Sequence, residues 1–345
     1  MIILCTLLIY AFYFVGDYTV LGVPLLPIFS VATFLTLNKI NNVSLSTNNY
    51  WFLIMTLIYL VVYTLGNLSA AFEFTDHFFH FNIPLLVLSV LAITRFPVTR
   101  NTTLIANIVF FYFTLTTIIG FDPSPFGPNI EYRIIAFLFL LSGSQRHLWN
   151  FVKYVSYFFV SIYGYSRGGM ITYLMIMWTR SKRLQIFTLI AVPIVLITVI
   201  YYSLEIRFSF FGLRAVFFDL KNGSEATRID LYGEALKNIL DLDIQKLFLG
   251  DPSHIYSTFY THNVYFDLFL LYGIVPGLIV IIGVIRFIAS TWHQIANANS
   301  GLLVSYFYAV LIGSLVSGGM HENWIILVVG LLSLDRTFLS NFRKL

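Results

Sequence analysis

The chain has 345 residues, of which 58% are hydrophobic and only 10% charged, and its mean hydropathy is +0.83. Soluble domains are about 45–50% apolar and about 25% charged. The composition therefore excludes a soluble globular enzyme, a disordered chain and a nucleic-acid-binding protein. The net charge of +4 is too small to indicate a polyanionic partner. The single cysteine, Cys5, lies in an apolar run and provides neither a disulfide nor a metal cluster.

Apolar segments separated by polar, proline or glycine residues predict an all-α, polytopic transmembrane bundle of about twelve helices. In chain order they lie near residues 2–15, 18–37, 50–71, 82–95, 102–120, 130–143, 148–165, 167–180, 184–204, 262–285, 301–318 and 321–339. Several segments are short for a span, so a re-entrant or tilted pair would reduce the count to about ten or eleven. Residues 1–345 are expected to form a single integral membrane domain.

Positive charges are distributed unevenly among the connecting loops. With the N-terminus placed in the cytoplasm, the short outer loops contain only Arg133 and Arg167. The inner loops and segment ends then contain twelve basic residues: Lys39, Arg95, Arg100, Arg146, Lys153, Arg180, Lys182, Arg183, Arg286, Arg336, Arg343 and Lys344. Because short cytoplasmic loops are enriched in Lys and Arg, this asymmetry predicts that both termini are cytoplasmic. The remaining basic residues lie in loop 205–261, which is too long to report orientation.

Loop 205–261 is long compared with the other connections, and such loops usually have a function. Within residues 226–240, an apolar helical stripe is formed by Ile229, Tyr232, Leu236 and Ile239. This spacing predicts an amphipathic helix that lies on the bundle or at the membrane interface. Thr227, with Asp230 three positions later, is typical of a capping box at the start of that helix.

Two arginines on the predicted outer face occupy unfavourable positions. Arg228 falls in the first turn of the amphipathic helix, where a cation opposes the helix dipole, so it is either tolerated by solvent or retained for a ligand. Arg167 lies at the outer mouth of a span, against the positive-inside bias. Gly168 and Gly169 follow it and allow a bulky ligand to approach the backbone closely. The alternative for Arg167 is a snorkelling side chain at the interface.

A histidine lies where the long loop re-enters the membrane. His262 is followed by Asn263 and by Asp267 at the head of the next span. Taken alone, such a histidine is more often an interfacial residue with satisfied hydrogen bonds than a catalytic one.

Metal-ligating residues gather at one predicted outer loop. They are Glu73, Asp76, His77 and His80. Histidines three positions apart can ligate a metal, but a solvated loop is the more frequent arrangement. No acidic pair in a short outer loop is suited to hold a divalent metal with a diphosphate, and the chain contains no P-loop, dinucleotide fingerprint or nucleophile elbow. The sequence therefore predicts no metal centre.

The order of these motifs resembles that of one known family. A Ser-Arg-Gly-Gly sequence at 166–169 adjoins a span, and a long outer loop contains an arginine-headed helix. LFLG at 247–250 follows, and His-Asn at 262–263 precedes LYGIVPG at 271–277. In this order and spacing, residues 160–290 resemble the O-antigen polymerase and O-antigen ligase superfamily. One departure is Asp251, where the family often has a second glycine.

The resemblance implies a glycosyltransferase without metal or cofactor that uses undecaprenyl-diphosphate-linked oligosaccharides at the periplasmic face of the bacterial inner membrane. Arg167 and Arg228 match the family's two key arginines and would stabilise the diphosphate leaving group in place of a metal ion. His262 matches the family's histidine and would orient, or deprotonate, the attacking sugar hydroxyl. Further candidates for contacts with substrate are Arg207, Arg214, Ser166 and Asn263.

The acceptor distinguishes the alternatives, and the sequence does not reveal it. We favour an O-antigen polymerase, on the length and the aromatic-rich, asparagine-rich character of the chain, with a chain-length regulator protein as a candidate partner. The enzyme alternative is an O-antigen ligase, which transfers polysaccharide to lipid A-core. A lipid-linked oligosaccharide flippase or transporter is the alternative of another class. Transporters bury ionisable groups near the midplane, often in two related halves, whereas here the charges gather at the outer face and no repeat is found.

Overall fold

The computed structural model describes residues 19–20, 23–24, 100–118, 128–143, 147–163, 167–188, 224–241, 243–250, 263–315 and 324–343. These residues are predominantly helical, as predicted. Their helices are α6 (Arg100–Ile118), α7 (Pro128–Leu141), α8 (His147–Tyr163), α9 (Arg167–Arg180), α11 (Ser224–Leu240), α12 (Ile244–Leu249), α13 (Val264–Tyr272), α14 (Ile274–Ala296), α15 (Leu302–Gly313), α16 (Trp324–Leu332) and α17 (Arg336–Arg343). Residues 182–188 are also helical.

Five predicted segments coincide closely with observed helices. They are 102–120, 130–143, 148–165, 167–180 and 301–318, which correspond to α6, α7, α8, α9 and α15. Each is a long apolar run bounded by polar residues or glycine, which explains why the pattern alone located it. The predicted segments 2–15, 50–71 and 82–95, and most of 184–204, lie outside the described residues.

Three predicted spans differ from the structure. The segment predicted at 262–285 is two helices, because α13 ends at Gly273, whose φ of 90° suits a residue without a Cβ. The segment predicted at 321–339 is α16 and α17, separated by a turn at 333–335. The segment predicted at 18–37 begins with the short strands β1 (Thr19–Val20) and β2 (Val23–Pro24), which pair antiparallel. β-Branched residues favour strands, and Pro24 disfavours a helical Val23.

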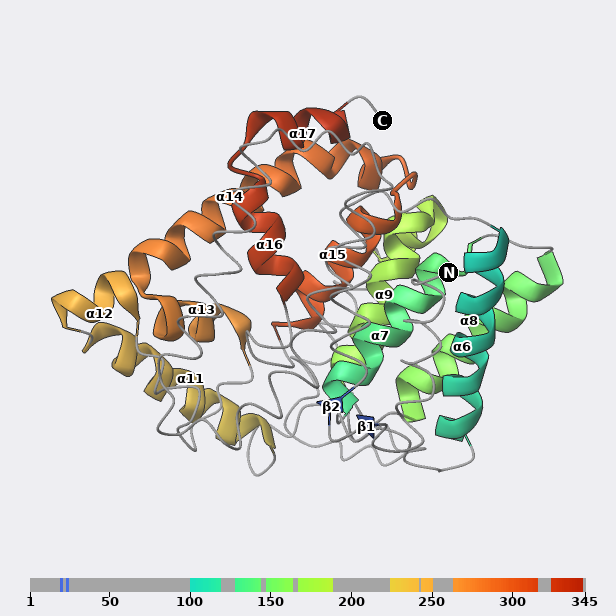
Figure 1. The fold of residues 1–345 in the computed structure, drawn as a ribbon, viewed down its shortest axis with the longest axis horizontal. Coiled ribbons are helices and arrows are strands. Elements are labelled where there is room, and N and C mark those ends of the chain that lie inside the picture. Colours follow the sequence, from blue (N-terminus) through green and yellow to red (C-terminus); the bar gives the residue numbers. More distant parts are fainter. Residues whose placement is uncertain are drawn as a thin grey trace.

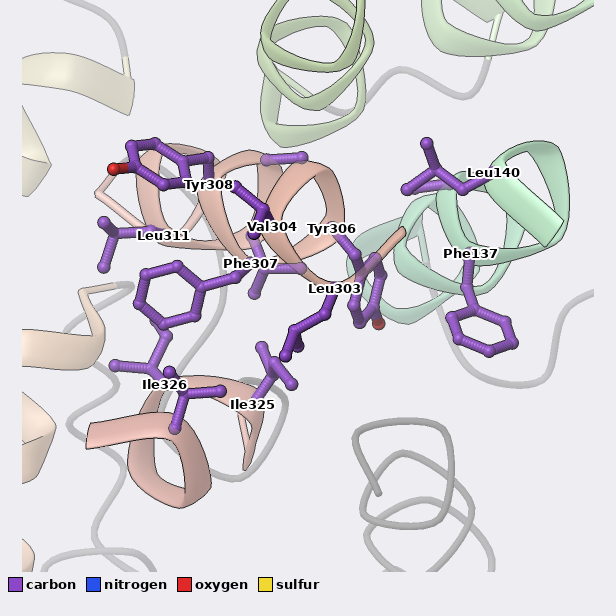
Figure 2. Close-up of a cluster of buried hydrophobic side chains, with 14 of the residues drawn as sticks. Phe137, Leu140, Leu303, Val304, Tyr306, Phe307, Tyr308, Leu311, Ile325 and Ile326 are labelled. Atoms are coloured by element: carbon purple, nitrogen blue, oxygen red, sulfur yellow. The ribbon is translucent and has the colours of Figure 1, made fainter. Parts of the chain in front are cut away.

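Helix α15 lies among α7, α9 and α16 (Figure 1). Every residue from Leu303 to Leu311 is buried, as expected for a helix that is apolar around its whole circumference. Figure 2 shows this helix with side chains facing both α7 and α16. The Tyr306 ring packs edge-on against Phe137 of α7 at 5.4 Å between centroids, and Phe307 packs likewise against Phe287 of α14 at 4.7 Å.

The remaining helices extend the bundle on two sides. Helices α6 and α8 pack on each other and on α7, whereas α16 and α17 pack on α14. Helices α11, α12 and α13 form a group that joins the bundle through α13 and α14 (Figure 1). The N-terminus of α14 therefore adjoins this group, and its C-terminus reaches the residues that precede α15.

Small polar side chains are buried between the helices, while large apolar side chains face outward. The Thr172 hydroxyl donates to the carbonyl of Ala309 at 3.4 Å, and the Ser300 hydroxyl donates to the carbonyl of Thr179 at 2.8 Å. Outward-facing apolar residues of α14 include Val275, Leu278, Ile279, Ile282 and Ile285. The exposed face of α14 thus differs from that of a helix in a water-soluble protein, which is polar.

One described helix is long and apolar enough to cross a membrane. Helix α14 has 23 residues, which extend about 35 Å at 1.5 Å per residue, and a bilayer core is about 30 Å thick. The apolar stretches Thr103–Leu115, Tyr132–Leu141 and Leu302–Gly313 are shorter. Within the part of the chain that the structure describes, membrane association is thus supported by α14.

Helices α14 and α16 touch through their backbones. A Cβ placed on Gly283 would overlap the carbonyl group of Gly330, and a Cβ on Gly330 would lie 2.8 Å from Val280 Cγ1. Small residues that allow such contact are typical of helix pairs in membranes. The Arg286 guanidinium also donates to the carbonyl of Leu334 at 2.9 Å, which connects α14 to the end of α16.

We expect Gly283→Ala to destabilise the protein, because the added methyl group forces α14 and α16 apart. Overpacking of this kind costs about 1–3 kcal/mol, and the substitution should lower the melting temperature of the purified protein in detergent. The matched control is Gly233→Ala in α11, where a Cβ meets nothing within 4 Å. The control should leave stability unchanged or raise it, since alanine favours helix more than glycine. Equal melting temperatures for the two variants would contradict the close contact.

Candidate functional site

The ends of several helices meet at one end of the bundle. A Cβ on Gly313, the last residue of α15, would lie 3.5 Å from the carbonyl oxygen of Gly168 and 3.5 Å from the Tyr132 hydroxyl. Gly168 is the second residue of α9, and Tyr132 lies near the start of α7. The starts of α7 and α9 therefore lie beside the end of α15. We call this region the Leu315 end, after the residue that follows α15.

Helices α11 and α13 both contact the Leu315 end through hydrogen bonds to one carbonyl group. The Leu315 carbonyl accepts hydrogen bonds from Tyr232 Oη of α11 and from Asn263 Nδ2, each at 3.4 Å. Tyr265 Oη donates to the carbonyl of Leu311 at 3.3 Å, one turn earlier in α15. The Leu311 carbonyl also accepts from Ser314 Oγ at 2.8 Å. The side chains of α11 and α13 thus add hydrogen bonds at the end of α15, where helix carbonyl groups have fewer backbone partners.

Asn263 has two roles at the Leu315 end. It is the N-cap of α13, with extended backbone, and its Oδ1 accepts from the Tyr265 amide at 2.9 Å. Its Nδ2 reaches Leu315, so one side chain both begins α13 and attaches it to α15. Asp267 lies in the first turn of α13, where a carboxylate is favoured by the helix dipole, and is buried.

Helix α11 packs on α13 with a face that differs slightly from the predicted one. Ala235 and Ile239 are buried, and the Tyr232 ring lies 5.3 Å from that of Phe266. Of the two expected positions, the bundle or the membrane interface, the structure shows α11 packed on α13 of the bundle. Leu236, expected in the apolar stripe, is 52% exposed, because Ala235 occupies the contact instead.

The predicted start of α11 is wrong. The helix begins at Ser224, so Thr227 lies inside it and does not cap it. Arg228 is consequently the fifth helical residue and not a member of the first turn, which removes the dipole argument made for it. Glu225 occupies the first turn, where an acidic residue is favourable. Arg228 stands one turn before Tyr232, so the two positions share a helix face.

The structure locates three of the predicted site residues. Arg167 is the first residue of α9, Asn263 caps α13, and Arg228 belongs to α11, whose Tyr232 contacts Leu315. All three elements meet at the Leu315 end. The other predicted site residues, His262, Arg207, Arg214 and Ser166, lie outside the described residues, as do Glu73, Asp76, His77 and His80. Within the described residues, no three metal-ligating side chains gather.

Sequence reasoning assigned no chemical role to Arg133, which is fully buried on α7. Its guanidinium carbon lies 4.7 Å from the centroid of the Tyr132 ring, a cation–π distance. Tyr132 in turn packs against α9, since a Cβ on Gly169 would lie 3.3 Å from its Cβ. The available signal was a cation inside an apolar segment, which in a membrane protein indicates a functional residue by default. Arg133 had been counted only for orientation.

Two glycine-containing motifs, far apart in sequence, also meet. Gly250, which ends the 247–250 motif, has φ of 69° and lies so close to the backbone of Leu271 that a Cβ would overlap it. Leu271 begins the 271–277 motif, in which Gly273 separates α13 from α14. Gly250 allows the end of α12 to approach the end of α13 closely, so the 247–250 and 271–277 motifs contact each other through their backbones.

The helix dipoles and the arginines at the Leu315 end favour an anion, while the buried carboxylate of Asp267 in the first turn of α13 opposes one. Helices α9 and α13 both begin there, and helix N-termini carry partial positive charge with unpaired amide groups. Arg167 stands at the start of α9, and Arg133 lies on the adjacent helix. Comparison with protein-family models, with curated proteins and with solved structures finds no match to this chain. The functional inference therefore depends on these residues.

We expect Asn263→Ala to loosen the start of α13, because it removes both the cap and the contact with Leu315. Loss of an N-cap costs about 0.5–2 kcal/mol, and amide hydrogen exchange in residues 264–267 should accelerate. Asn263→Ser restores a capping oxygen and should recover part of the protection. The control is Asp243→Ala, which removes the exposed cap of α12 and should affect only that helix. Unchanged exchange in Asn263→Ala would contradict the described role.

Proposed function

We propose that this chain is a membrane-embedded glycosyltransferase of the O-antigen polymerase type. It joins undecaprenyl-diphosphate-linked repeat units at the periplasmic face of the bacterial inner membrane without a metal ion. The observation that carries the proposal is the convergence of α9, α11 and α13, which bear Arg167, Arg228 and Asn263, around the end of α15. Those three residues belong to motifs whose order resembles that family.

The leaving group accounts for the positive charge at the Leu315 end. Cleavage of a glycosyl–diphosphate bond leaves negative charge on the diphosphate, which must be stabilised as it develops. Arginine pairs with phosphate through two parallel hydrogen bonds. Arg167 and Arg228 would act in this way, assisted by the dipoles of α9 and α13. Arg207 and Arg214 remain candidates for further phosphate or glycan contacts.

The acceptor is assigned to the start of α13. His262 immediately precedes Asn263, the cap whose side chain contacts Leu315. A histidine with a near-neutral pKa can accept the proton of the attacking sugar hydroxyl or orient that hydroxyl toward the anomeric carbon. Asn263 and Ser166 would then contact sugar hydroxyl groups beside it.

The distribution of polar and apolar side chains supports a membrane location with the site facing outward. Apolar residues line the exposed face of α14. Residues assigned to the outer face by the charge count, Arg133 and Arg167, belong to the Leu315 end. Arg180, assigned to the inner face, ends α9 at the opposite end of the bundle, and Lys182 follows it. This separation agrees with cytoplasmic termini.

We expect Arg167→Ala and Arg228→Ala each to abolish chain extension while the protein remains in the membrane. Lysine should rescue poorly, because an ammonium group cannot reproduce the planar guanidinium. The readout is lipopolysaccharide gel analysis of a deletion strain that carries each variant. Core with a single repeat unit indicates a lost polymerase, whereas bare core with lipid-linked polymer indicates a lost ligase.

The matched control for the arginine variants is Arg183→Ala, which removes an exposed arginine that follows α9 at the opposite end. It should support full-length polysaccharide. Wild-type polysaccharide in both alanine variants would remove Arg167 and Arg228 from the site. Bare core in the deletion strain, with accumulation of lipid-linked repeat units on the cytoplasmic side and no lipid-linked polymer, would favour the flippase.

We expect polymerisation by the purified protein to continue in excess EDTA, because arginines and not a divalent cation stabilise the leaving group. His262→Ala should lower turnover while donor binding is largely kept, since the arginines bind the donor's charge. The assay uses purified lipid-linked repeat units as donor and acceptor. If EDTA stops the reaction and magnesium restores it, the arginine-only account is wrong, and Glu73, Asp76, His77 and His80 become the first candidate ligands.

A further inference from the structure

Two cations lie close together at the end of the bundle opposite Leu315. Lys153 of α8 is only 3% exposed, and Arg180, the last residue of α9, is partly buried. The two helices pack on each other, and the two side chains are near enough for their charges to repel. This end of the bundle also contains Gly143, after which we name it the Gly143 end.

The contacts of these two cations neutralise them incompletely. Lys153 Nζ donates to the Gly143 carbonyl at 2.7 Å and lies 5.4 Å from the centroid of the Phe139 ring. Arg180 Nε is buried and has no hydrogen-bond acceptor. Among the residues that the structure describes, no carboxylate lies within ion-pair distance of either cation. The described partners of Lys153 are thus a carbonyl dipole and an aromatic face, and Tyr154 is the described electrostatic neighbour of Arg180.

Such an arrangement is unfavourable unless an anion completes it. Buried charges in proteins are paired, because desolvating an isolated ion costs several kcal/mol and like charges add repulsion. Both side chains can donate to one phosphate group, Arg180 through its planar guanidinium and Lys153 as a point charge. The described residues therefore provide donors for an anion at this position but no carboxylate acceptor for them.

The surroundings favour a lipid phosphate. Lys182 and Arg183 follow α9 and are exposed, which adds positive charge beside the buried pair. Gln185 Nε2 donates to the carbonyls of Trp178 and Ile295 at 2.9 and 2.6 Å and thereby fixes the basic segment 182–188 against α14. Basic pockets between membrane helices are typical binding sites for anionic lipid headgroups.

We propose that Lys153 and Arg180 bind the phosphate group of an anionic phospholipid in the leaflet that borders the Gly143 end. The site lies at the opposite end of the bundle from Arg167 and Asn263 and does not depend on glycosyl transfer. The lipid would act as the missing counter-ion and stabilise the packing of α8 against α9. A free phosphate ion has the same chemistry, and the test separates these two sources.

The test measures the melting temperature of the full-length protein in phosphatidylcholine nanodiscs with and without phosphatidylglycerol, and in detergent with and without inorganic phosphate. We expect phosphatidylglycerol to raise the melting temperature of the wild-type protein. Arg180→Met removes a charge without removing a described hydrogen bond. It should melt at or above the wild-type temperature in phosphatidylcholine alone, and the increase from phosphatidylglycerol should be lost. Native mass spectrometry should show about fivefold weaker retention of phosphatidylglycerol in this variant.

The matched control is Lys182→Met, which removes an exposed cation at the same end and should keep the increase. Lys153→Met is a second variant. It should also lose the increase in melting temperature, although it removes the hydrogen bond to Gly143 as well. An equal increase from inorganic phosphate in detergent supports the phosphate site and makes the soluble ion its source. The proposal is overturned if neither phosphatidylglycerol nor phosphate raises the melting temperature, or if Arg180→Met responds as strongly as wild type.

Discussion

The arrangement of the bundle depends on the need to bury α15 on all sides. This helix is apolar around its circumference, so α7, α9 and α16 must surround it. The carbonyl groups at the end of α15 lie in a low-polarity environment, where an incompletely satisfied group is costly. Tyr265, Tyr232 and Asn263 provide hydrogen bonds there. The candidate site thus lies where these side chains form hydrogen bonds to the carbonyl groups at the end of one buried helix.

Short polar side chains make this close packing compatible with an apolar interior. Hydroxyl groups of Thr114, Ser161 and Thr291 donate to carbonyl groups one turn earlier in their own helices, at 2.7–2.9 Å. These hydrogen bonds satisfy the hydroxyl donors without requiring an acceptor on a neighbouring helix. Some longer polar groups reach carbonyl groups far away in sequence near the helix ends, with Asn263 at one end of the bundle and Gln185 at the other, where Lys153 reaches Gly143. The two ends of the bundle therefore differ in chemistry.

Sequence patterns could predict whole helices better than their interruptions. The runs that became α6 to α9 and α15 are apolar and bounded by polar residues, so hydropathy locates them. Gly273 is flanked by apolar residues on both sides, and glycine is frequent inside membrane helices, so hydropathy alone does not reveal the break between α13 and α14. Pro276, three residues later, was the local cue. Thr227 and Asp230 satisfy a capping pattern inside α11, which misplaced its start. The topology predicted from the charge asymmetry places Arg167 and Asn263 on the same side of the membrane. The contact of Asn263 with Leu315 and the burial of Arg133 depend on helix packing, which the hydropathy pattern does not specify.

The close association of α9 with α15 has a consequence for the order in which the protein assembles. The hydrogen bonds that join them connect residues 137 and 126 positions apart, from Thr172 to Ala309 and from Thr179 to Ser305. At about 5–20 residues per second, α15 leaves the ribosome roughly 6–25 s after α9. Throughout that interval α7 and α9 lack the helix that later covers them, and the interhelical acceptors of Thr172 and Thr179 are absent. Assembly is therefore completed late, and the early helices need a protected environment until α15 is inserted.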